Sequence, residues 1–190
     1  MQNLPIISLR VVQEGVIPSS GKAVHTPEDA IACVQSYLQD RNRETALALF
    51  LKTDGTPIGC QILTYGSIGA AYIPVGEMMK TGLLCNAAKC ILVHNHPSGC
   101  LHPSKADIQL TANVIKAGRL LEIPLLDHII VGPGTTYYSL QEKRELELVC
   151  PPSNQKVTLQ DLFSPEEITA LVAEQTPQLS PFEELFASLP

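Results

Sequence analysis

The sequence lacks the features that mark membrane and secreted proteins. No apolar run approaches the roughly 18 residues that a membrane-spanning helix needs. The first residues, from Met1 to Pro5, show no basic segment followed by an apolar one, which is the pattern of a secretion signal. We therefore expect a cytoplasmic protein.

Cysteine pairs and basic clusters are also missing. The six cysteines form no Cys-x-x-Cys pair and no regular framework, so the sequence leaves disulfides open but favours free thiols in a reducing compartment. Lys and Arg number 13 against 19 Asp and Glu, which gives a net charge of -6. No aromatic residues interleave with a basic stretch. This balance disfavours broad attraction to nucleic acid phosphates, although a local basic patch stays open.

What the chain does contain is a pattern of alternating strands and helices. It has 190 residues, of which 45% are hydrophobic, enough for one domain with a proper core and an appendage. Helix starts are predicted at Thr26-Pro27, at Pro74 and at Ser104, the last helix running to about Leu121. Strands are predicted at 6–12, 45–51, 58–65, 89–94, 125–131 and 135–140. The pattern predicts an α/β (α+β) fold, a mixed sheet flanked by helices.

A change of composition near 151–154 predicts a domain boundary. Two prolines, Pro151 and Pro152, follow the last predicted strand of the domain. Beyond them, Ser164 and Ser180 are N-cap signals, each opening a short amphipathic helix. We expect a domain at 1–150 and a helical C-terminal extension at 151–190, which either docks on the domain or binds a partner.

The strongest chemical signal lies where a buried strand ends. His94 and His96 stand one residue apart, so on extended backbone their imidazoles project to the same side. Asp107 follows in the first turn of a helix and can fold back towards them. Two nitrogens and one oxygen, with one position left open, are what a catalytic zinc site needs. These three residues are therefore candidate zinc ligands.

Other interpretations of these residues exist. The histidine pair could be chance, with one ring a satisfied core residue. Ser104 and Asp107 together form a capping-box pattern, which would explain both without a metal. The capping box does not explain two histidines directly upstream in a sharply turning loop, so the metal hypothesis is preferred on the combination.

The same stretch resembles a known protein family. His-x-His-Pro, six residues and Ser-x-x-Asp form the signature of the JAMM (MPN+) metalloproteases, complete here from His94 to Asp107. Within that superfamily the sequence resembles RadC-like JAB domains over roughly residues 44–140. Four segments carry the resemblance: 94–99, 103–104, 117–121 and 123–132. The resemblance implies the JAB/MPN architecture, which is like that of cytidine deaminases. It also implies Zn²⁺ as cofactor and amide hydrolysis as the reaction.

The resemblance assigns two further roles. A glutamate just before the first core strand acts as general base in the family, and Glu44 matches that position better than Glu77 or Glu122, which lie at helix ends. Otherwise Glu44 would be read as an ordinary solvated acid. Ser104 would stabilise the tetrahedral oxyanion, with helix capping as its competing role.

The chain also departs from the family pattern. After His-Pro-Ser-Gly, relatives usually carry an acidic residue, whereas this chain has Cys100 followed by Leu101 and His102. Cys100 and His102 could approach the metal, and Cys100 could act as an inhibitory ligand, but a loop substitution without chemical role is preferred. His128 is interpreted as structural or as a support to a ligand. Full-length relatives carry an upstream helical region, for which this chain is expected to begin too late.

Two functions follow as hypotheses. The first is a zinc-dependent metallopeptidase or isopeptidase acting on a protein or peptide, including isopeptide-linked ones. The second is a DNA-repair or mobile-element accessory protein associated with nucleic acid, in which the metal site is structural or of unknown use. The acidic charge of the chain does not favour this second hypothesis. The sequence identifies neither the substrate nor the oligomeric state.

Overall fold

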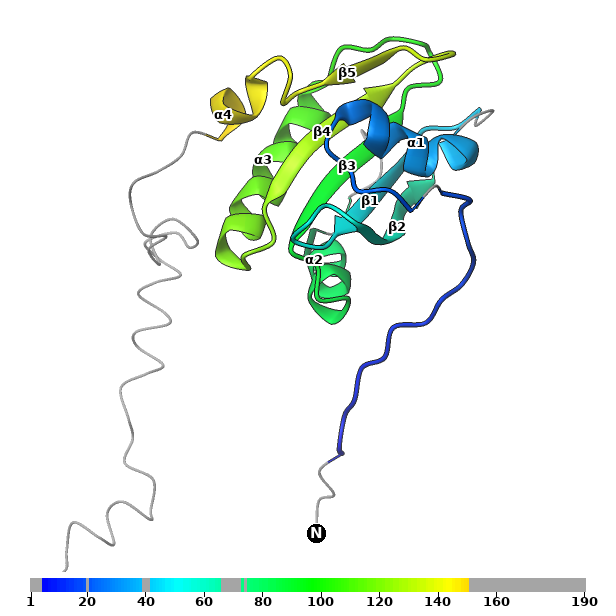
Figure 1. Cartoon of the computed structure of the whole chain (residues 1–190). Helices are drawn as coiled ribbons and strands as arrows, with labels where there is room; N and C mark the ends of the chain where they lie inside the picture. Colours follow the sequence, from blue (N-terminus) through cyan, green and yellow to red (C-terminus); the bar gives the residue numbers. More distant parts are fainter. Residues whose placement is uncertain (1–4, 20, 39–41, 66–72, 74, 151–190) are drawn as a thin grey trace, which may run out of the picture. The chain divides into compact units, whose positions relative to one another are not determined.

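The core of the protein is a mixed sheet with helices on both faces (Figure 1). A computed structural model describes residues 5–19, 21–38, 42–65, 73 and 75–150. The chain divides into two units at Pro151 and Pro152, and all the described residues belong to the first. No helix in these described ranges is long and apolar enough to cross a membrane.

The order of the strands in the sheet is β2-β1-β3-β4-β5. Antiparallel pairing joins β1 to β2 and to β3, and β4 to β5, whereas β3 and β4 run parallel with α3 as their crossover. The elements are α1 Pro27–Leu38, β1 Thr45–Leu51, β2 Pro57–Tyr65, α2 Val75–Leu84, β3 Lys89–Asn95, α3 Lys105–Leu120, β4 Leu125–Val131, β5 Tyr137–Ser139 and α4 Glu145–Val149.

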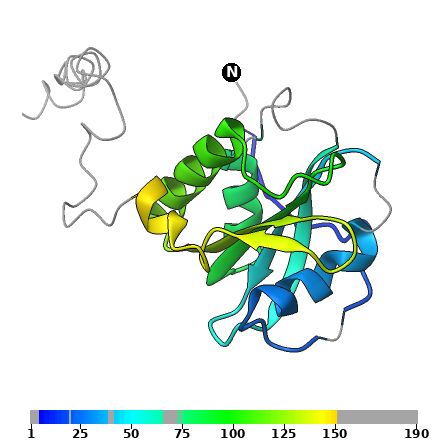
Figure 2. The same ribbon diagram turned by 90° about the horizontal axis from the view of Figure 1, so that it is seen from above.

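The strand β1 is buried on both faces, as its continuous apolar sequence predicts. Its odd-numbered leucines pack with α1, and its even-numbered residues, including Phe50, pack with α2 and α3. Figure 2 shows the same layers from above, with α1 on one side of the sheet and α2 and α3 on the other. In β3, Cys90 and Leu92 belong to the α2 and α3 side. Because side chains alternate along a strand, His94 lies on that side as well.

Local chemistry sets the ends of the helices. Thr26 caps α1 as predicted: its Oγ1 accepts from the Asp29 amide at 3.3 Å, and Asp29 Oδ2 accepts from the Thr26 amide at 3.0 Å. Near the end of α3, Gly118 lets the chain fold back towards β4. A Cβ atom there would lie 2.4 Å from the carbonyl oxygen of Ile123, so a side chain is sterically excluded.

Several predictions about elements need correction. The predicted strand at 6–12 is wrong: residues 5–19 contain no strand, and Ile6 and Ile7 are fully or largely exposed. A strand needs a partner to pair its backbone groups, and apolar composition alone does not provide one. The spacing of apolar residues after Pro74 predicts that Leu83 and Leu84 lie on the packed side of α2, but they are 50% and 39% exposed. The helices predicted in 151–190 lie outside the described residues.

Candidate metal centre

The topology of the sheet brings the candidate residues together at one end of its inner strands β1 and β3. The strand β3 ends at Asn95, next to the beginning of β1, and Ala46 pairs with His94 across this antiparallel ladder. Glu44 directly precedes β1, so it arrives beside the histidines. On the α3 side, Asp107 lies in the first turn of the helix. Three separate elements therefore converge on one point.

Asn95, between the two histidines, fixes the backbone on both sides of Glu44. Its Oδ1 accepts a hydrogen bond from the Thr45 amide at 2.8 Å, and its Nδ2 donates to the Arg43 carbonyl at 3.2 Å. Asn95 is only 8% exposed, so the bond to Thr45 is buried and the one to Arg43 is partly buried. The position of Glu44 is thus tied to the histidine loop through one buried amide.

The four candidate groups form a single cluster. One nitrogen or oxygen atom from each of Glu44, His94, His96 and Asp107 lies within 4.8 Å of each of the others. His94 and Asp107 are buried, whereas Glu44 and His96 are half-buried. The cluster is therefore buried on the side of His94 and Asp107 and more open to solvent on the side of Glu44 and His96, where a substrate could enter.

The carboxylate of Asp107 has two different oxygens. Its Oδ2 accepts from the Ser104 amide at 2.7 Å, and Ser104 Oγ accepts from the Asp107 amide at 3.2 Å, which completes the capping box of α3. Its Oδ1 is buried and has no hydrogen-bond partner. That atom lies 3.4 Å from Nε2 of His94. Burying a carboxylate oxygen without a hydrogen-bond partner costs free energy. The capping box therefore accounts for Oδ2 of Asp107 but not for Oδ1.

The two histidines face each other through their Nε2 atoms, which are 2.9 Å apart. Burial lowers the pKa of His94 well below its usual value, and the neighbouring rings of His128 and His96 lower it further. His94 is therefore a neutral ring at pH 7. His96 places its Nδ1 atom 2.6 Å from the main-chain carbonyl oxygen of Cys100.

A third histidine, His128, contacts the other ring nitrogen of His94. Nδ1 of His94 is 2.9 Å from Nε2 of His128, and Nδ1 of His128 is 2.6 Å from the Thr111 hydroxyl. Burial lowers the pKa of His128 to about 4, although the charge of Asp107 acts in the opposite direction. The sequence singled out His128 but missed Thr111. Only the i, i+4 spacing from Asp107 on one helix could have pointed to it.

The comparisons with known proteins agree with this geometry. A sequence model of the RadC-like JAB domain family matches residues 24–146, more than half of the 190 residues. The chain belongs to the RadC-like JAB domain family. Its mixed sheet flanked by helices is consistent with the fold of that family, as the sequence predicted.

Relatives of this RadC-like chain carry names that state no activity. A UPF0758 protein of Haemophilus ducreyi is 41% identical over 123 residues, which cover 65% of this chain and 55% of the relative. A UPF0758 protein of Methanosarcina acetivorans is 33% identical over 130 residues, covering 68% and 56%. One of Desulforamulus reducens is 38% identical over 120 residues, covering 63% and 52%. The chain thus spans about half the length of these relatives.

In this JAB domain the residues that replace the usual acidic position stay out of the cluster. Among the described residues, the group that could hold a metal does not include Cys100 or His102. Cys100 is exposed, and all six cysteines are free thiols. The ring of His102 instead contacts that of Tyr138 edge-on, with centroids 5.7 Å apart.

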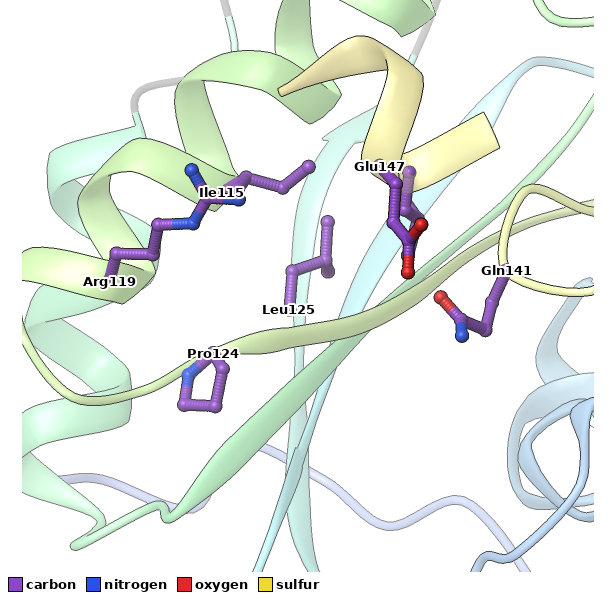
Figure 3. Close-up of a pocket in the computed structure, with 7 residues that line it drawn as sticks. Ile115, Arg119, Pro124, Leu125, Gln141 and Glu147 are labelled. Atoms are coloured by element: carbon purple, nitrogen blue, oxygen red, sulfur yellow. The ribbon is translucent and has the colours of Figure 1, made fainter. Parts of the chain in front are cut away.

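A separate pocket lies between α3, β4 and α4 (Figure 3). Ile115 and Arg119 of α3, Leu125 of β4 and Glu147 of α4 are among the residues that line it. The guanidinium of Arg119 donates to the carbonyl oxygen of Cys150 at 2.6 Å, so it helps to hold the end of α4. The pocket brings together no group of metal ligands comparable to the histidine cluster among the described residues.

Proposed function

We propose that this protein is a zinc-dependent hydrolase of amide bonds, a metallopeptidase or isopeptidase. The observation that carries the proposal is the buried Oδ1 atom of Asp107. It has no hydrogen-bond partner and lies 3.4 Å from a histidine nitrogen. A protein gains little from such an atom unless a cation completes its surroundings.

The donor set fits zinc. Imidazole nitrogens and a carboxylate oxygen are common zinc ligands, and three protein ligands with an open position are typical of catalytic zinc sites. The Cys100 carbonyl can only accept a hydrogen bond, so the Nδ1 atom of His96, 2.6 Å away, carries the proton. In the neutral ring, the lone pair of Nε2 then faces His94 and Asp107. His94, His96 and Asp107 would hold the ion.

The remaining residues of the cluster supply the chemistry of proton transfer. When bound, zinc acts as a Lewis acid that activates water for attack on a carbonyl. Glu44, half-buried and within 4.8 Å of the three candidate ligands, takes a proton from the attacking water and later delivers it to the leaving amine. Ser104 is exposed, and its capping bond uses only an oxygen lone pair. Its hydroxyl proton is left to donate to the developing oxyanion.

The test separates metal binding from catalysis. We expect about one zinc per chain by elemental analysis, as for a single catalytic site. A quenched-fluorescence library of peptides, including Lys isopeptide linkages, provides the substrates. Glu44→Gln should keep its zinc and lose about 10²- to 10⁴-fold in hydrolysis rate. Glu77→Gln, at an exposed position of α2, is the matched control and should change neither.

Two results would contradict the proposal. A purified protein that binds no zinc at micromolar free metal overturns the site. Glu44→Gln with undiminished hydrolysis overturns the general base. Association with nucleic acid stays a prediction, and the net charge of -6 argues against it. A shift of unmodified DNA in a gel at low salt, lost as salt rises, would support that alternative.

A further inference from the structure

Behind the candidate metal centre runs a continuous chain of polar contacts. The Asp107 carbonyl oxygen is 2.6 Å from the Thr111 hydroxyl, which is 2.6 Å from Nδ1 of His128. Nε2 of His128 is in turn 2.9 Å from Nδ1 of His94. All four residues are at most 1% exposed. Water therefore has no access to these contacts, and the protons must be shared among the groups themselves.

The protons in this row of contacts can be assigned by starting at the Asp107 carbonyl oxygen, where only one donor and acceptor arrangement is possible. A carbonyl oxygen only accepts, so the single hydroxyl proton of Thr111 belongs to its contact with Asp107. Thr111 then accepts from His128, whose proton is on Nδ1. A neutral His128 has a bare Nε2 atom, so His94 donates to it from Nδ1. The lone pair of His94 is left on Nε2, facing His96 and Asp107.

The opposite assignment of protons, in which Thr111 donates to His128, leaves an unfavourable contact. If Thr111 donated to His128, its oxygen and the Asp107 carbonyl oxygen would stand 2.6 Å apart without a proton between them. Both belong to fully buried residues of one helix and cannot move apart easily. In the favoured assignment the contact without a proton is the one between the Nε2 atoms of His94 and His96, 2.9 Å apart. A cation can fill that position, and none can fill the other.

We propose that Thr111 and His128 are positioning residues that hold His94 in the form protonated on Nδ1, so that Nε2 is always ready to bind metal. This inference rests on the proposed zinc site. It also distinguishes the two histidines. His94 is set by buried side chains on α3 and β4, whereas His96 is set by a main-chain carbonyl in a loop. Removing a side chain that contacts the ring directly can therefore alter the protonation of His94, whereas that of His96 changes only if the loop backbone moves.

The first experiment measures zinc affinity by competition with a chelator. Thr111→Val has nearly the same shape but no hydroxyl, and His128→Leu removes the acceptor for His94. Each should weaken zinc binding about 10- to 100-fold, as is usual when a residue supporting a metal ligand is lost. Thr111→Ser keeps the hydroxyl and His128→Gln offers an oxygen near the Nε2 position. Both should stay close to the wild type.

The second experiment reads the proton positions directly in the metal-free protein. Long-range ¹H–¹⁵N correlation spectra distinguish a ring protonated on Nδ1 from one protonated on Nε2. We expect His94 to be protonated on Nδ1 in the wild type and to shift towards Nε2 in Thr111→Val. This measurement needs no bound zinc. If the wild type binds no zinc, the proposed function fails while the spectra still decide the arrangement of protons.

The control lies on a neighbouring polar cluster. Ser139 is buried, and its hydroxyl donates to Asp127 at 2.6 Å and accepts from the Glu142 amide; among the described residues it has no hydrogen bond to the side chains of Thr111, His128 or His94. Ser139→Ala should therefore lower stability without changing zinc affinity or the state of His94. The inference is overturned if Thr111→Val and His128→Leu bind zinc like the wild type. It is also overturned if Thr111→Ser is as weak as Thr111→Val, or if wild-type His94 is protonated on Nε2.

Discussion

Among the described residues two aspartates are buried, Asp107 and Asp127, and they differ in how their oxygens are hydrogen-bonded. Asp127 is 5% exposed, and both of its oxygens have partners: Oδ1 accepts from the amides of His128 and Gln141, and Oδ2 accepts from Ser139. Asp107 is 0% exposed, and its Oδ1 has no partner. Asp127 fastens β4 to the turn after β5. Asp107 has an oxygen without a hydrogen-bond partner, which lies 3.4 Å from Nε2 of His94.

Burial alone does not distinguish a structural carboxylate from a candidate metal ligand, because both aspartates are buried. What differs is whether hydrogen-bond donors of the protein satisfy every oxygen. His128 links the two regions: its main-chain amide donates to the structural Asp127, and its ring contacts the candidate ligand His94.

The largest expected effect is on zinc affinity when each aspartate is changed to asparagine. Asp107→Asn removes a charged candidate ligand and should weaken zinc binding by more than about 100-fold, beyond the loss expected for a supporting residue. Asp127→Asn should leave the affinity nearly unchanged, because its oxygens face only protein donors. Chelator competition measures both. Equal losses in the two variants would show that the difference between the aspartates is not functional.

The stability of the metal-free protein should show the opposite order. Asp127→Asn replaces a carboxylate that accepts three hydrogen bonds by a neutral amide, whose N–H₂ group can pair with Ser139 only if that hydroxyl turns to accept, which should cost about 1–3 kcal/mol in the free energy of unfolding. Asp107→Asn replaces a buried carboxylate that lacks a partner by a neutral amide, which can donate towards His94. We expect no loss of stability there, or a gain. Urea denaturation with zinc removed measures both values, and a less stable Asp107→Asn would contradict the interpretation.

Acid should destabilise the metal-free protein through the histidines. The pKa of His128 is about 4 in the folded protein and about 6.5 in the unfolded chain. Between these values the unfolded chain binds a proton at His128 and the folded protein does not. Stability therefore falls between about pH 6.5 and 4, by on the order of 3 kcal/mol. Buried His94, with its lowered pKa, acts in the same direction.

Asp127 should act in the opposite direction and more weakly. Burial raises its pKa against the hydrogen bonds from Ser139, Gln141 and His128, so the folded protein binds this proton before the unfolded chain does. Stability is gained as pH falls through that raised value. Unfolding curves for His128→Gln and Asp127→Asn separate the two contributions. The loss between pH 6.5 and 4 should shrink in His128→Gln, and an unchanged loss would contradict the assignment.

The sequence predicted the parts of the site that lie close together in the chain. His94, His96 and Asp107 stand within one motif, and the apolar run at 45–51 predicted a buried strand that the structure confirms. Glu44 came only from the family resemblance. Its closeness to the histidines depends on the pairing of β1 with β3, which no local pattern encodes.

The features that sequence analysis missed or misassigned depend on a distant partner or lack a local signal. Residues 6–12 have the composition of a strand but no strand beside them. The short helix α4 was missed, because its start at Arg144 adopts a left-handed conformation with φ of 58° and offers no capping side chain. Thr111 was missed because its hydroxyl matters only through His128, 17 residues away.

The smallest expected effect concerns Cys100, which replaces the family's usual acidic residue. Its contribution to the site is a main-chain carbonyl that fixes the proton of His96, and its exposed side chain adds nothing to that. Cys100→Ala should therefore change the free energy of unfolding by less than about 0.5 kcal/mol. Zinc affinity should stay that of the wild type.

The neighbouring glycine provides the contrast that makes this small effect informative. Gly99 has φ of +76°, a conformation that costs an L-residue about 1–2 kcal/mol, and it directly precedes the Cys100 carbonyl. Gly99→Ala should move that carbonyl away from His96 and weaken zinc binding more than Cys100→Ala does, in the same competition assay. If Cys100→Ala instead changes zinc affinity and Gly99→Ala does not, the thiol acts at the metal. The proton of His96 would then need another explanation.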